Sequence, residues 1–464
     1  MKKILVLLCL LFCTGFSLVS AEQKEEPQKI DYKEQYEEAR FFYATANACL
    51  AAYDDRVGNI FYTFMQHDGW HAERFKKTGE LADVNIFLAK RFDPQSGKNT
   101  YILSFRGTAS KKDVRLDKRT GRVLFAGSSL EEIKKNAERL DVPDTFPKVH
   151  KGFLQYTLAA LSADLENEDL VPDSDRLYDV IKEDANSELI ITGHSLGGAA
   201  AVLYAASIVN MGVPSERVKV VTFGAPAVGN KEFAEIYQDK INVTRIYSSF
   251  DPVPGGLQSF YSYVQFGKPF VVRSDPRVRV MQHNMENYAD LMGKYYYSCK
   301  DEAIEHGVIP KDPVSYDEGS GKIVAVAVIQ PVGEYRLVDY KYARENLLDA
   351  YRWSFFRYRI LDIADRKVSK LELEDMARKI GADYLLTARV GISRVRVTKE
   401  WIIALDQALF TTDGTLVSGL THSVKIKEGG SFFQASAYNG FKAVESLHDL
   451  DVGLVRPLDY LVSE

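Results

Sequence analysis

Along this 464-residue chain, hydrophobic positions recur at helical spacing in some segments and form short strand-like runs in others. Apolar residues at helical spacing over 36–53 predict a first helix. Apolar runs at 84–89 and 100–105 predict two strands of a hairpin, with a turn at 94–97 between them. The chain therefore begins as a mixed helix and strand protein.

Helical and strand patterns then alternate through the middle of the chain. Alternation at this spacing predicts an α/β fold with a mostly parallel sheet and helices on both faces. The expected helices are about 152–165, 176–186 and 198–206, and the expected strands are 189–192, 218–223 and 242–247.

A composition shift near Pro310 predicts a second, smaller α/β unit. Proline, glycine and charged residues over 310–321 are typical of a linker. We therefore expect a first domain over 22–309, a linker over 310–321 and an accessory domain over 322–464. Its expected strands are 323–330, 358–363, 383–390, 402–411 and 415–426, and its helices are about 343–351, 370–380 and 432–448.

The first residues have the pattern of a secretory signal. A basic start at Met1-Lys2-Lys3 precedes an apolar run over 4–19, and Ser20-Ala21 supplies small residues for a cut after Ala21. The run is short for a membrane anchor, and Phe12 before Cys13 disfavours lipidation. We expect an exported protein, secreted or periplasmic and envelope-associated in a bacterium, with no transmembrane segment in the mature chain.

Charge and cysteine usage exclude several classes of function. The formal charge of −5 becomes −7 if Lys2 and Lys3 are removed, and no basic cluster is present, so nucleic acid is not an expected partner. The chain has no phosphate-binding Gly-Lys-Ser/Thr loop and no Cys or His cluster at metal-ligand spacing, so we expect no cofactor and no metal. Cys49 and Cys299 form either one disulfide or two buried free thiols.

The segment 189–198 is the strongest chemical signal. Four strand-forming residues lead into Gly193-His194-Ser195-Leu196-Gly197, and a helical run of small residues follows. This strand–turn–helix context is that of a nucleophile elbow, in which Gly193 and Gly197 avoid side-chain collisions around Ser195.

A serine nucleophile needs a base and an orienting carboxylate, in the chain order Ser, acid, His. Asp251 follows the strand 242–247 and opens Asp251-Pro252-Val253-Pro254, so we expect it at the same sheet edge as Ser195. Asp275 is its rival. His283 is the expected base, with His306 as the alternative.

Two other histidines lie near motifs but are not expected to be the base. His150 precedes the elbow, which favours a structural hydrogen-bonding role, and His194 should point away from the substrate. For the oxyanion, the predicted donors are the backbone N–H of Leu196 and Thr108, the latter in the turn after the strand 100–105.

These motifs together resemble the class 3 lipases over about residues 39–291. They are Phe105-Arg106-Gly107-Thr108, Val149-His150-Lys151-Gly152-Phe153, Gly193-His194-Ser195-Leu196-Gly197-Gly198, Phe223-Gly224-Ala225-Pro226-Ala227-Val228-Gly229-Asn230 and Asp251-Pro252-Val253-Pro254. The resemblance implies an α/β-hydrolase fold and carboxylic ester hydrolysis through an acyl-enzyme. It also implies Ser195, Asp251 and His283 as the triad, with Thr108 and Leu196 as oxyanion donors.

One segment departs from that family. Where many members have an apolar lid, residues 109–119 are highly charged. A helix carrying Leu130, Ile133, Ala137 and Leu140 on one face is either a displaced lid or a packed surface helix. A long-chain triacylglycerol is therefore a less secure expectation than a lipid ester in general.

The second unit loosely resembles small α/β domains of bacterial envelope proteins. The similarity lies in Arg359-Ile360-Leu361-Asp362 and in the segment 377–387. It implies an envelope partner, and a purely structural extension is the alternative.

The sequence thus predicts an exported serine esterase or lipase whose partner is a lipid or other ester substrate. The alternatives are a phospholipase or thioesterase on the same triad, or an inert envelope scaffold.

Overall fold

The computed structural model describes most of the chain. The described residues are 30–53, 56–67, 69–78, 83–107, 121–163, 170–171, 176–273, 283–311, 322–329, 340–355, 358–364, 368–395, 397–398, 400–426 and 432–447. The signal segment, Thr108, the charged segment 109–119, Asp275 and most of the linker lie outside them.

The first part of the chain builds a seven-stranded sheet with the order β1-β2-β3-β6-β7-β8-β9. The first three strands pair antiparallel, and every pair from β3 to β9 is parallel, which confirms the mostly parallel α/β sheet. The strands are β1 (His71–Thr78), β2 (Asp83–Asp93), β3 (Lys98–Phe105), β6 (Ser187–His194), β7 (Val218–Phe223), β8 (Asn242–Ser248) and β9 (Lys268–Val272).

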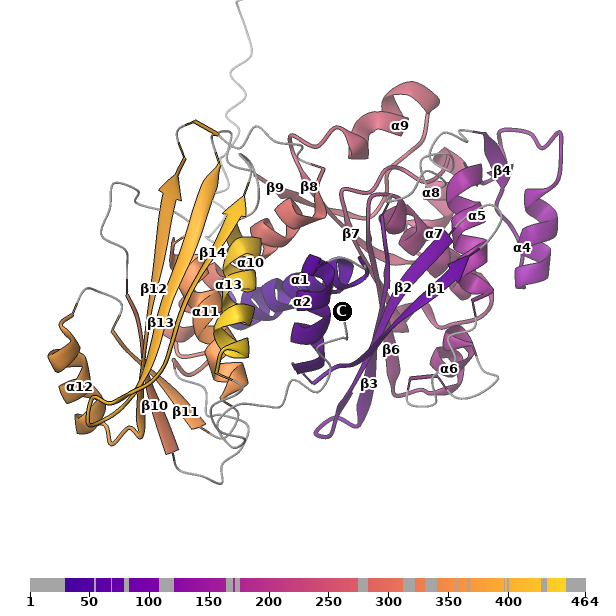
Figure 1. The fold of residues 1–464 in the computed structure, drawn as a ribbon. Helices are drawn as coiled ribbons and strands as arrows, with labels where there is room; N and C mark the ends of the chain where they lie inside the picture. The colour runs from indigo at the N-terminus through magenta and orange to yellow at the C-terminus, as the bar shows by residue number, and fades with distance from the viewer. Residues whose placement is uncertain are drawn as a thin grey trace, which may run out of the picture.

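Helices cover both faces of this sheet (Figure 1). One face carries α1 (Tyr32–Ala51), α2 (Arg56–His67) and α10 (Met285–Glu305). The other face carries α5 (Lys151–Leu161) and α7 (Leu196–Asn210). The remaining elements of this part are α6 (Leu177–Glu183), α8 (Lys231–Tyr237), α9 (Val253–Tyr261) and the 3-10 helix η1 (Ser215–Arg217).

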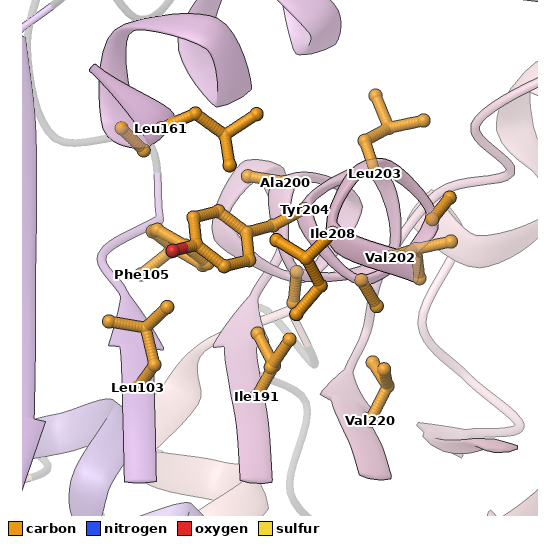
Figure 2. Packing of buried hydrophobic residues seen from close by; sticks show 14 of the residues in the cluster. Leu103, Phe105, Leu161, Ile191, Ala200, Val202, Leu203, Tyr204, Ile208 and Val220 are labelled. Atoms are coloured by element: carbon orange, nitrogen blue, oxygen red, sulfur yellow. The ribbon is translucent and has the colours of Figure 1, made fainter. Parts of the chain in front are cut away.

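The core beneath α7 shows why the elbow is held rigidly. Leu103, Ile191 and Val220, on three neighbouring strands, point at the underside of α7 (Figure 2). Leu203 and Tyr204 of the helix are buried in the same cluster. Full burial of such a side chain contributes about 1.5–3 kcal/mol, so this packing fixes the position of the strand end that carries Ser195.

The helix considered as a lid, α4 (Leu130–Ala137), is a packed surface helix. Ser129 caps its start, and Leu130 and Ile133 are buried in the main core. Leu140 lies beyond the helix end and is 86% exposed. The neighbouring β4 (Arg122–Leu124) and β5 (Lys148–His150) form a two-stranded ribbon.

The second part builds a five-stranded sheet with the order β11-β10-β12-β13-β14. The helices α11 and α13 pack on one face, and α12 packs on the other. The strands are β10 (Lys322–Ile329), β11 (Tyr358–Ala364), β12 (Tyr384–Arg394), β13 (Trp401–Thr411) and β14 (Leu416–Ile426), and the helices are α11 (Tyr340–Ser354), α12 (Lys370–Lys379) and α13 (Phe432–Glu445).

The two parts meet along α10 (Figure 1). Lys300 on α10 contacts Asp349 on α11 at 2.9 Å, and Asp301 pairs with Lys341. Helix α13 also contacts α10 and α2. Helix α11 of the second part is thus joined by side chains to α10, the helix that begins two residues after His283.

The two cysteines of the described residues settle one further prediction. Cys49 and Cys299 are both free and buried, so the disulfide alternative is wrong and the free-thiol alternative is correct. None of the helices within the described residues is long and apolar enough to span a membrane.

Candidate active site

Ser195 lies on a sharp turn between β6 and α7. Its backbone has φ 57° and ψ −123°, a conformation that costs a non-glycine residue free energy and is held by its surroundings. Its N–H donates to the carbonyl of Phe223 at 3.0 Å. The turn therefore presents the Ser195 hydroxyl beyond the end of the strand.

Glycines on either side make this turn possible. A Cβ on Gly193 would come within 2.3 Å of the backbone of Gly197, and one on Gly197 within 2.1 Å of the carbonyl oxygen of Phe105. Both contacts are far closer than real Cβ atoms allow. The collisions expected from the sequence are thus present in the structure.

The structure brings Ser195, His283 and Asp251 into one line of hydrogen bonds. His283 Nε2 lies 2.7 Å from Ser195 Oγ, and His283 Nδ1 lies 2.8 Å from Asp251 Oδ2. The three residues come from the elbow, the segment after β8 and the residues just before α10. Their predicted catalytic roles remain predictions, but the geometry is that required of a nucleophile, a base and an orienting acid.

The Asp251 carboxylate is buried and accepts three hydrogen bonds. Its Oδ1 accepts from the N–H of Val253 at 2.9 Å, and its Oδ2 also accepts from the Tyr288 hydroxyl at 2.5 Å. Burial opposes ionisation, but the hydrogen bonds from His283, Tyr288 and Val253 outweigh it and hold the pKa of Asp251 below its usual value. An ionised Asp251 only accepts, so Nδ1 of His283 carries a proton and Nε2 can accept one from Ser195.

Tyr288 is a site residue that the sequence analysis missed. It lies in the first turns of α10, and its oxygen also accepts from the N–H of Ser248 at 3.2 Å. Burial, followed by the charge of Asp251, raises the pKa of Tyr288 far above its usual value, so it stays a donor. An aromatic residue with a hydroxyl one turn into the helix after His283 was the only available signal.

The predicted oxyanion donors are only partly described. Leu196 is the first residue of α7, where N–H groups have no acceptor within the helix. The Ser195 N–H is already bonded, so the N–H of Leu196 is the first one in the elbow that can point at an oxyanion. Thr108 lies outside the described residues, but the preceding Gly107 is described.

The other histidines have different roles in the structure. His150 accepts from the N–H of Phe153 at 3.3 Å and caps α5, as expected from its place in the chain. His306 ends α10, stacked on Tyr32, at the opposite end of that helix from His283. His194 is hydrogen-bonded to Tyr53 and to the backbone of His283.

Comparison with known proteins shows a similarity of the elbow region to one family. Residues 102–258 match the family model described as Lipase (class 3). The chain is 29% identical over 236 residues to the chloroplastic phospholipase A1-Igamma2 of Arabidopsis thaliana, covering 47% of this chain and 40% of that protein. It is 33% identical over 114 residues to the secreted mono- and diacylglycerol lipase A of Penicillium cyclopium, covering 24% of this chain and 36% of that protein.

The chain thus spans less than half the length of these two relatives. Among solved structures, the Rhizomucor miehei triacylglyceride lipase is 20% identical with a TM-score of 0.38, covering 52% of this chain and 80% of that chain. The mostly parallel seven-stranded sheet with helices on both faces fits the α/β-hydrolase fold. The region of this chain that carries the Ser195 elbow, residues 102–258, is therefore similar to the class 3 lipases.

Proposed function

We propose that this chain is a serine carboxylic-ester hydrolase of the lipase type that works through an acyl-enzyme. The observation that carries the proposal is the line of hydrogen bonds from Ser195 through His283 to Asp251. The match to the class 3 lipases supports it.

In the proposed reaction, Ser195 Oγ attacks the ester carbonyl while its proton passes to His283 Nε2. The oxyanion is held by the N–H of Leu196 and, as predicted, by Thr108. Collapse of the tetrahedral intermediate breaks the bond to the alcohol, which leaves with the proton from His283. Water, deprotonated by His283, then attacks the acyl-enzyme, and the acid leaves as Ser195 regains its proton.

The proposed substrate class is a lipid ester. The relatives in the comparison are named as a phospholipase A1 and a mono- and diacylglycerol lipase, so both headgroup types are candidates. Matched diacylglycerol and diacyl-phosphatidylcholine with the same acyl chains would separate them. An acyl-CoA of the same chain length would reveal a thioesterase.

Short-chain p-nitrophenyl esters give the first test of the activity. We expect the purified mature protein to hydrolyse p-nitrophenyl butyrate and Ser195→Ala to lose that activity. A fluorophosphonate probe should label the native protein on Ser195. Intact hydrolysis by Ser195→Ala contradicts the proposal, and an unlabelled, inactive native protein favours the inert scaffold.

Export belongs to the same proposal. The basic start, the apolar run 4–19 and Ser20-Ala21 support a signal peptide. N-terminal sequencing of protein recovered outside the cytoplasm should then begin at Glu22. An envelope partner for the second sheet stays a prediction from sequence, and recovery of the protein uncleaved from the cytoplasm would count against export.

A further inference from the structure

The peptide bond between Arg106 and Gly107 lies between two tyrosines. The hydroxyl of Tyr156 donates to the carbonyl of Arg106 at 3.2 Å. The hydroxyl of Tyr53 lies against Gly107, where an added Cβ would come within 2.6 Å of it. This peptide immediately precedes Thr108, so its position decides where the predicted oxyanion turn begins.

Tyr53 also connects this turn to the histidine of the elbow. Its hydroxyl lies 3.1 Å from His194 Nδ1. The other ring nitrogen, His194 Nε2, lies 3.1 Å from the backbone carbonyl oxygen of His283. One chain of hydrogen bonds thus runs from Tyr53, which lies against Gly107, through His194 to the backbone of the predicted base.

The protonation state of His194 fixes which atoms donate and which accept in these hydrogen bonds. Burial, with a smaller contribution from His283, lowers the pKa of His194 to about 3, so the ring is neutral and carries one proton. A carbonyl oxygen only accepts, so the proton is on Nε2 and Nδ1 accepts from Tyr53. The Tyr53 hydroxyl that donates to His194 is the same one that lies against Gly107.

The surroundings leave little room for other arrangements. His194 is 6% exposed, and the side chain of His283 is held at its other face by Asp251. A Cβ on Gly107 would come within 2.6 Å of the Tyr53 hydroxyl and 2.8 Å of the His194 carbonyl oxygen. The turn and the elbow are therefore in direct contact through this network.

We propose that Tyr53 and His194 are positioning residues that hold the Arg106–Gly107 peptide and the backbone of His283 at a fixed separation. The proposal rests on the proposed function, because the groups they hold are the predicted oxyanion turn and base. Neither residue takes part in proton transfer to the substrate. Their effect is on how well the base and the oxyanion donors are aligned, which is felt in the transition state.

Tyr53→Phe is the sharpest variant, since it removes one oxygen and keeps the ring. We expect kcat on p-nitrophenyl butyrate to fall by about 10- to 100-fold, the range that a misplacement of about 1 Å costs, with KM changed by less than about twofold. Tyr237→Phe is the matched control: it removes a buried hydroxyl bonded to Asn210, at the opposite end of α7 from Ser195. It should lower stability and leave kcat unchanged.

Rescue at His194 distinguishes positioning from simple packing. His194→Gln keeps an amide donor that can reach the carbonyl of His283, whereas His194→Leu keeps volume without a donor. We expect His194→Gln to retain at least about 10-fold more kcat than His194→Leu, and Tyr53→Phe to add little to His194→Leu because both break the same chain. Active-site titration with a fluorophosphonate corrects each rate for unfolded protein.

Equal kcat for Tyr53→Phe and the native protein would overturn the proposal, as would an effect confined to KM. Equal kcat for His194→Gln and His194→Leu would overturn the role of His194. These results are distinct from failure of the proposed function, in which the native protein itself neither hydrolyses the ester nor takes the label. In that case both proposals fall.

Discussion

Helix α10 joins two buried polar clusters that differ in what they can do. Near its start, Tyr288 donates to Asp251, which holds His283 against Ser195. Near its end, Lys300 is buried between Asp349 and the rings of Tyr296 and Tyr297. Both clusters perturb the pKa of several groups.

The second cluster has strongly perturbed groups but nothing suited to attack a substrate. Burial opposes ionisation of Asp349, yet Lys300 and Arg352 outweigh it and lower its pKa. Burial raises the pKa of Tyr296 and Tyr297 well above its usual value, so both phenols stay neutral. An ammonium group has no lone pair, and the carboxylate accepts from two cations.

The cluster at Ser195 differs in two physical features. Its predicted nucleophile, Ser195, stands on a strained turn at the end of a strand and is partly exposed, and so is the predicted base, His283. Its one carboxylate orients a group that can both accept and release a proton. Perturbed pKa values alone therefore do not locate an active site; a reachable nucleophile in contact with a base does.

The substitution expected to separate the two clusters most clearly is Asp251→Asn, because it should have the largest effect on kcat. An amide can stabilise the wrong tautomer of His283, which leaves Nε2 unable to accept the Ser195 proton. We expect kcat to fall by about 10⁴-fold, equivalent to ~5 kcal/mol of transition-state stabilisation. Denaturant unfolding and ester hydrolysis measured on the same preparation test this. A kcat within tenfold of the native value would remove Asp251 from the triad.

Substitutions in the second cluster should lower stability and leave kcat nearly unchanged. Asp349→Leu leaves the buried ammonium of Lys300 without its carboxylate, so we expect a loss of ~2–3 kcal/mol in unfolding free energy. Per folded molecule, kcat should stay within about twofold. The double variant Lys300→Met with Asp349→Leu should recover most of the stability, because replacing both partners removes the unpaired charge. A large loss of kcat in folded Asp349→Leu would show that the two clusters are coupled through α10.

The sequence predicted the first cluster much better than the second. Ser195, Asp251 and His283 were found because their chemistry requires a set order and because glycine and proline mark the turns that hold them. Lys300 was not found because lysine on a helix normally lies in water, and nothing in the sequence shows that α11 will cover it. Its partner, 49 positions away, follows from how the two sheets pack.

Strands and helices, too, were predicted where the local sequence marks them and missed where it does not. The two hairpins, over β2–β3 and β13–β14, were predicted from alternating runs around glycine-containing turns. The edge strand β1 was missed because His71–Thr78 is mostly polar and lacks a clear apolar alternation. Tyr288 was missed because its contact with Asp251, 37 positions away, depends on the rotation of α10 about its own axis.

Tyr288→Phe should have a smaller effect. It tests whether Tyr288 acts through its hydrogen bond to Asp251 or only by stabilising the fold. The variant removes one donor from Asp251 but leaves His283 and the N–H of Val253 in place. A hydrogen bond to a charged group contributes ~1.5–3 kcal/mol, so we expect kcat to fall by about 10- to 100-fold. Tyr351→Phe, which breaks a buried bond to Gln407 in the second sheet, is the control that should lower stability alone. If both variants lower kcat equally, Tyr288 acts through the fold and not through Asp251.

The smallest expected effect is on the free energy of unfolding at low pH. Its measurement compares the carboxylates of Asp251 and Asp349 directly. Asp251 and Asp349 both have a lowered pKa in the folded protein. Such a group stabilises the fold above its unfolded pKa, which is about 3.9, and this stabilisation is lost as the pH falls through the lower folded value. Denaturant unfolding from pH 6 to pH 3 should therefore show a fall in stability that begins near pH 4. Asp349→Asn should make that fall shallower, and so should Asp251→Asn, because each removes one titrating group. Parallel curves for the native protein and Asp349→Asn would mean that Lys300 and Arg352 do not stabilise the ionised carboxylate, and the second cluster would then be held by packing alone.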